Sequence, residues 1–167
     1  MKSRLSSILL AALVLAGSSV MVSQHRVDAE TEFSAETITL EAAARVIEAA
    51  LAKSEELGVT MNITVLDVGA NLKAFVRMDD AMLGSLDISM KKAKTAVLFN
   101  GPSSGLGAIS QPGGVVYGIE ESNGGLVTFG GGFPLHNADG KLIGSIGVSG
   151  SSVANDEIVA KAGVDAL

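Results

Sequence analysis

Apolar residues recur at two spacings along the chain and predict alternating helical and extended segments. Over residues 40–57 they follow the three-to-four-residue spacing of an amphipathic helix, with Thr39 as N-cap and Gly58 as the end. Two runs of strand type follow, at 59–66 and 72–78, separated by a polar turn. We therefore expect a helix followed by a β-hairpin.

The second half of the sequence predicts another helix, a long loop and a second group of strands. Ser85 or Asp87 is expected to cap a helix that runs to about Phe99 and ends at Gly101-Pro102. The glycine-rich segment 103–125 is expected to be a loop with one short helix. Three strands and a closing helix are then expected at 126–129, 133–137, 142–149 and 153–167.

This order of elements predicts the fold class. Two groups of strands separated by a helix, with an Asp139-Gly140 turn in the last hairpin, favour antiparallel pairing. We expect an α+β fold with a five-stranded antiparallel sheet and helices packed on it.

The first residues have the pattern of an export signal. A basic start and an apolar run over 5–17 precede small residues that end at Ala29. We expect a secretory signal peptide over 1–29 and a single domain over 30–167, secreted or periplasmic. A retained membrane anchor is the alternative, because apolar residues continue to Val22.

Composition narrows the classes of partner. The net charge is −6 at pH 7, and removing the expected signal would make it more negative, so nucleic acid is a poor partner. The chain has no cysteine, which excludes disulfides and thiolate metal sites. Tryptophan is also absent.

Several segments in a fixed order carry a resemblance to a known family. They are 39–43, 65–79, 87–96, Phe129-Gly130-Gly131-Gly132-Phe133-Pro134-Leu135 and Ile143-Gly144-Ser145-Ile146-Gly147-Val148-Ser149-Gly150. Together they are similar to the GlcG/HbpS family of haem-binding proteins, which includes a domain fused to cobalamin adenosyltransferases.

The resemblance implies a profilin-like, five-stranded sheet and assembly into homo-oligomers. In the secreted branch it implies extracellular haem binding coupled to a membrane sensor kinase. The chain departs from the family pattern at Ala70 and Asp80, where the family often has glycine. These departures affect the expected turn geometry more than the fold.

The second helix carries the candidate ligand surface. At 100° per residue, Ile88, Lys91, Lys92, Thr95 and Phe99 share one broad face. An apolar surface edged by ammonium groups suits haem and its propionates. The resemblance implies haem contact by a threonine of this helix, which we place on Thr95. The alternative is that the lysines form a solvated or subunit-facing surface.

Candidate iron ligands are few. His136, the one histidine after residue 29, offers an imidazole, although its place near the last hairpin turn also fits a solvated surface residue. Met78, Met82 and Met90 offer sulfur, and Tyr117 a phenolate, with core or loop packing as the alternative.

The functional expectation is a secreted haem-binding protein for sensing, storage or protection of haem, with a sensor-kinase ectodomain as partner. Two alternatives stay open: a haem-degrading enzyme, and an interaction or small-molecule-binding module that does not take haem. No triad, metal cluster or carboxylate pair is recognisable in the sequence, so nothing specific supports catalysis.

Overall fold

The computed structural model describes residues 36–167. The expected signal peptide lies outside the described residues. In chain order the elements are α1 (Leu40–Leu57), β1 (Asn62–Asp67), β2 (Leu72–Arg77), α2 (Gly84–Phe99), α3 (Ser103–Ile109), the 3₁₀ turn η1 (Ile119–Glu121), β3 (Gly132–His136), β4 (Leu142–Ser149) and α4 (Val153–Val164).

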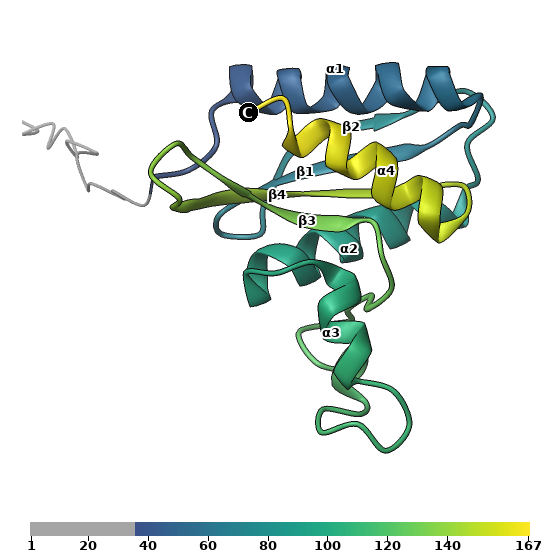
Figure 1. Cartoon of the computed structure of the whole chain (residues 1–167), viewed down its shortest axis with the longest axis vertical. Coiled ribbons are helices and arrows are strands. Elements are labelled where there is room, and N and C mark those ends of the chain that lie inside the picture. Colours follow the sequence, from purple (N-terminus) through teal and green to yellow (C-terminus); the bar gives the residue numbers. More distant parts are fainter. Residues whose placement is uncertain (1–35) are drawn as a thin grey trace, which may run out of the picture. The chain divides into compact units, whose positions relative to one another are not determined.

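The described residues form a four-stranded antiparallel sheet between two helical layers. The strand order is β2-β1-β4-β3, so the first and last hairpins meet where β1 pairs with β4. Helices α1 and α4 cover one face, and α2 covers the other (Figure 1). The α+β class is confirmed.

Local sequence explains the limits of α1. The Thr39 hydroxyl accepts a hydrogen bond from the Ala42 amide at 3.1 Å, which is N-capping geometry. Gly58 closes the helix with a left-handed φ of 64°. The buried stripe includes Val46 and Ile47, which belong to the main apolar core between α1, α4 and the sheet.

Helix α2 packs unusually close to the sheet. A Cβ atom built on Gly147 of β4 would lie 2.0 Å from the Ser89 carbonyl oxygen and 2.5 Å from the Ala93 amide nitrogen. The Ser89 hydroxyl is also 2.9 Å from the Thr64 hydroxyl of β1. Small residues and one hydroxyl pair, rather than large apolar side chains, therefore fix α2 on the strands.

One expected strand is absent from the described residues. Segment 126–129 lies outside the sheet, because the Leu126 amide donates to the Glu120 carbonyl and the Val127 amide donates to the Thr95 hydroxyl. With those donors used, the sheet has four strands, and the five-stranded profilin-like form is not confirmed. The expected side-chain cap of α2 is also wrong, since the helix begins at Gly84 without one.

Within residues 36–167, no helix combines the length and the apolar character needed to cross a membrane. The alternative of an N-terminal anchor concerns residues outside this range.

Candidate functional site

A cavity of about 280 Å³ opens beside α2, where the β1–β2 hairpin and the end of the glycine-rich loop meet the helix. We refer to it as the α2 cavity. It is lined by Leu66, Ala70, Leu72, Asp87, Met90, Lys91, Lys94, Gly124 and Gly125.

The lining combines an apolar wall with two cationic side chains. Leu66, Leu72 and Met90 supply the apolar wall, and Lys91 and Lys94 supply the ammonium groups. Such a lining favours a ligand that has a hydrophobic body and negatively charged substituents.

Asp87 forms an ion pair with Lys91, one of the two lysines of the cavity. Its Oδ2 lies 2.7 Å from Lys91 Nζ, one helical turn away, and the two side chains keep 64% and 34% of their exposure. An exposed i,i+4 pair of this kind contributes only about 0.3–0.5 kcal/mol. An anionic ligand can therefore displace Asp87 from Lys91 at little cost.

The glycines of the loop make room for the lysines. Gly124 and Gly125 have φ values of 70° and 97°, which L side chains rarely adopt. A Cβ atom on Gly125 would lie 3.2 Å from Lys91 Cε, and one on Gly124 would lie 3.7 Å from Lys94 Nζ. Lys94 also donates to the Asn123 carbonyl, so this loop end and the lysines form one rim.

Thr95 lies behind the cavity wall. Its buried hydroxyl donates to the Lys91 carbonyl at 2.8 Å and accepts from the Val127 amide at 3.2 Å. Thr95 is absent from the described lining of the cavity. In this structure it fixes the strand-like end of the loop to α2, and a direct contact between Thr95 and ligand stays a prediction.

Lys92 requires a correction, because the structure places it in the core. Its side chain is fully buried, with Nζ 2.6 Å from Asp156 Oδ2 and 2.9 Å from the Val148 carbonyl oxygen. The Phe129 ring lies 4.8 Å from the same ammonium. Burial lowers the pKa of Lys92 and raises the pKa of Asp156, while their mutual hydrogen bond opposes both shifts. Lys92 therefore joins α2 to α4 and is not available at a binding surface.

The other predicted side chains of this surface do not line the α2 cavity. Ile88 is half-buried, and Phe99 is 41% exposed at the end of α2. Met78 packs against the core on the α1 side, with its sulfur 3.3 Å from the Met61 amide nitrogen. Among the residues that the sequence placed on this face of the helix, Lys91 is the one that lines the α2 cavity.

Lys94 completes the rim, although the ligand-binding helix face predicted from sequence did not include it. Lys94 follows Lys91 by three residues, so one helical turn brings the two side chains together, and this spacing could have indicated the pair. No sequence signal places Leu66, Leu72 or Gly125 there, because they come from a hairpin and a loop far along the chain.

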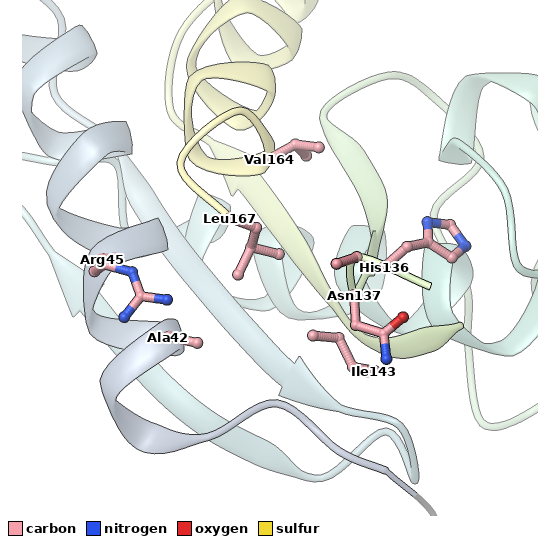
Figure 2. Close-up of a pocket in the computed structure, with 8 residues that line it drawn as sticks. Ala42, Arg45, His136, Asn137, Ile143, Val164 and Leu167 are labelled. Atoms are coloured by element: carbon pink, nitrogen blue, oxygen red, sulfur yellow. The ribbon is translucent and has the colours of Figure 1, made fainter. Parts of the chain in front are cut away.

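His136 lies at a second cavity of about 410 Å³, between the first turns of α1, the β3–β4 hairpin and the end of α4. We refer to it as the hairpin cavity. Figure 2 shows the imidazole turned away from Arg45. Nε2 of His136 is 2.9 Å from Asn100 Oδ1. The two cavities share no lining residue, so His136 and Lys91 are not brought together.

The remaining candidate ligands are scattered. Met82 and Tyr117 are exposed at 63% and 69%. In residues 36–167, no three His, Asp or Glu side chains gather closely enough to hold a metal ion. Met90, which lines the α2 cavity, is the sulfur that the structure brings close to Lys91 and Lys94.

Comparison with known proteins identifies a family and several similar proteins. The family model described as "Haem degrading protein HbpS-like" matches residues 38–165. An uncharacterized 15.0 kDa Citrobacter freundii protein, from the dhaT-dhaS intergenic region, is 40% identical over 130 residues, which span 77% of this chain and 91% of that protein.

Two further similarities involve PduO. The corrinoid adenosyltransferase PduO of Citrobacter freundii is 38% identical over 120 residues, which are 71% of this chain but only 36% of PduO. The crystal structure of the PduOC:heme complex matches with a TM-score of 0.75 and 34% identity, covering 78% of this chain and 95% of that one. The chain is thus similar to one part of PduO.

Proposed function

This chain belongs to the HbpS-like family, and from that premise we propose that it binds haem in the α2 cavity. The observation that carries the proposal is the pairing of an apolar wall with Lys91 and Lys94 in one cavity. The PduOC:heme complex, a similar structure, supports haem as the ligand.

The residues of the cavity fit the chemistry of haem. Leu66 and Leu72 would contact the porphyrin ring, and the two lysines would pair with the propionates. The Met90 thioether is a donor that haem iron accepts. Bound haem would supply redox and ligand-binding iron chemistry, while the protein would hold the ring and control access to it.

The test is a hemin titration of the full chain, in which binding is monitored by the Soret absorbance. We expect saturable binding that Lys91→Gln and Lys94→Gln each weaken about two- to fivefold, since a partly exposed ion pair contributes at most about 1 kcal/mol. Lys161→Gln is the matched control, because Lys161 of α4 forms a similar i,i+4 pair with Asp165, the C-cap of that helix.

Asp87 gives a variant of opposite sign. Asp87→Asn frees Lys91, so we expect it to tighten hemin binding about twofold. Absence of any saturable Soret change in the parent chain would refute haem binding. If binding is saturable but none of the three α2 variants changes its affinity, haem is still the ligand, but it binds outside this cavity.

Two substitutions separate the candidate iron ligands. If Met90 binds the iron, Met90→Leu changes the haem spectrum, whereas iron-free protoporphyrin IX still binds with about the same affinity. His136→Ala is the parallel variant in the hairpin cavity, and a changed spectrum there would favour His136 instead.

Haem turnover is the second candidate, favoured by the description of the family as haem degrading. Incubating the loaded protein with ascorbate and oxygen separates the two. The Soret band is compared with that of a control in which the protein is denatured. If the two bands persist for the same time, the result supports binding alone. Catalytic loss of the band, with release of iron, supports degradation.

We further propose that the protein acts outside the cytoplasm as a homo-oligomer that reports to a sensor kinase. The basic and apolar pattern of residues 1–29 supports export. Exposed apolar side chains on the loop, Val115 and Tyr117 among them, support self-association. N-terminal sequencing of the exported protein, light scattering and capture of a kinase ectodomain test the three parts separately.

A further inference from the structure

The hairpin cavity has a chemistry that haem binding at α2 does not use. Its lining is largely aliphatic, and Figure 2 shows Ile143 and Leu167 directed into the space between α1 and the hairpin. Ala42, Ala138 and Val164 complete the apolar part. A cavity of about 410 Å³ lies in the range in which proteins hold small molecules.

One permanent cation lines this cavity among the described residues. Arg45, on α1, contacts Glu41 at 3.3 Å, and the two side chains remain 49% and 87% exposed. A contact this long and this exposed leaves most of the guanidinium donors available and binds the group weakly. The planar fork of arginine is suited to bidentate binding of a carboxylate.

On the opposite wall, the polar side-chain atoms of Asn137 are engaged in hydrogen bonds. Asn137 Oδ1 accepts from the Asp139 and Lys141 amides, at 3.0 and 2.9 Å, and Nδ2 donates to Glu36 at 2.7 Å. Lys141 Nζ also lies 3.2 Å from Glu36. These groups satisfy one another, and the His136 imidazole is turned away from Arg45, with Nε2 2.9 Å from Asn100 Oδ1. Arg45 is therefore the side chain from which an anion would draw its hydrogen bonds.

We infer that the hairpin cavity binds a small aliphatic monocarboxylate, with the carboxylate on Arg45 and the hydrocarbon along Ile143 and Leu167. A single guanidinium matches a single negative charge. A multiply charged anion would meet the neighbouring Glu41 without a second cation to balance it. The two cavities share no lining residue, so this site is separate from the proposed haem site at α2.

The test is a titration of the full chain with butyrate at neutral pH, in which binding is monitored by two-dimensional amide NMR. We expect saturable shifts at Ala42 and Ile143, and binding about tenfold weaker for 1-butanol, which keeps the chain but lacks the charge. Butylammonium, with the opposite charge, should not bind.

Variants assign the charge partner. Arg45→Gln should weaken butyrate binding about tenfold, whereas Arg45→Lys should weaken it less, because it keeps the charge and loses the fork. Arg77→Gln, an exposed arginine of β2 that lines neither cavity, is the control. Amide shifts elsewhere in the spectrum establish that each variant is folded.

Any one of four results would overturn the inference. Shifts that never saturate mean that no site exists. Equal binding of butyrate and 1-butanol, or unchanged binding by folded Arg45→Gln, means that the carboxylate is not recognised. Displacement of butyrate by one equivalent of hemin would make this cavity part of the haem site.

Discussion

Two residues other than glycine hold left-handed backbone in the turns that flank β2. Ala70 has a φ of 62° and Asp80 a φ of 61°. Both are positions where the family resemblance implies glycine. An L side chain in this region is strained, by roughly 1–2 kcal/mol for most residues and less for Asp.

We expect Ala70→Gly to raise the free energy of unfolding by about 0.5–1 kcal/mol, with a smaller gain for Asp80→Gly, because removing the side chain relieves more strain than chain entropy costs. Urea denaturation measures both. The control is Ala44→Gly on the exposed face of α1, which should lower stability by about 1 kcal/mol. A loss at Ala70 comparable to that of the control would contradict the strain argument.

The buried pair of Lys92 and Asp156 makes a second prediction at the residue scale. Lys92→Met leaves a buried carboxylate without its partner, and we expect a loss of about 3–5 kcal/mol in unfolding free energy. The double variant Lys92→Met with Asp156→Leu should regain most of it. A Lys161→Met control, which removes an exposed pair, should change stability by less than about 1 kcal/mol.

That comparison also bears on the site. If Lys92→Met weakened hemin binding in a chain that remained folded, while Lys91→Met did not, then the assignment of Lys92 to the core would be wrong. The structure predicts the reverse order, because Lys91 lines the α2 cavity and Lys92 is enclosed.

At the scale of elements, the contact between α2 and β4 tolerates no added atom. Gly147→Ala would place a methyl group 2.0 Å from a backbone oxygen of α2, so either the helix moves or the strand bends. We expect a loss of about 3 kcal/mol. Gly105→Ala, on α3, has no heavy atom near the added methyl and should stabilise by about 0.5–1 kcal/mol. Chemical denaturation of both variants checks the pair.

The loop that ends at the α2 cavity is held by one carboxylate. Glu120 accepts hydrogen bonds from the Thr128 hydroxyl at 2.7 Å and from the Ser110 hydroxyl at 2.8 Å. The hydrogen bond from Thr128, with help from the backbone and Ser110, holds the pKa of Glu120 below its ordinary 4.5. The folded loop therefore favours the ionised form.

The sign of the pH effect follows from that shift. A carboxyl with a lowered pKa contributes stability above its unfolded pKa and loses it as the pH falls through its folded pKa. We expect amides of residues 110–128 to lose hydrogen-exchange protection when the pH is lowered from about 5 to about 3, and Glu120→Gln to abolish that dependence. A pH profile that is the same in both chains would contradict the role of Glu120.

At the scale of the whole molecule, the elements that the spacing of apolar residues predicted are those packed in the main apolar core. Helix α1, its Thr39 cap and its Gly58 end are confirmed, as is strand β4. Apolar residues recur at helical spacing in α1 and as a short apolar run of strand type in β4. Thr39 and Gly58 are residue types that favour the start and the end of a helix.

The parts that sequence did not predict depend on partners far along the chain. Helix α2 buries Ser89, Lys92 and Ala96, a face that hydrophobic periodicity does not recognise. The partner of Lys92 is 64 residues away. Segment 126–129 has the composition of a strand, but its amides bond to α2 and to the loop. Long-range hydrogen bonding decided each of these outcomes.

The attachment of the glycine-rich loop to α2 has a consequence for how ligand preference could change. The Thr95 hydroxyl and the Lys94 ammonium both fasten the end of the loop to the helix, and Gly124 and Gly125 line the α2 cavity beside them. No strand of the sheet runs through residues 110–125. We therefore expect that residues 110–125 can be replaced by the matching segment of a relative. The replacement would change the ligand selectivity of the cavity and leave the sheet and its helices unaltered.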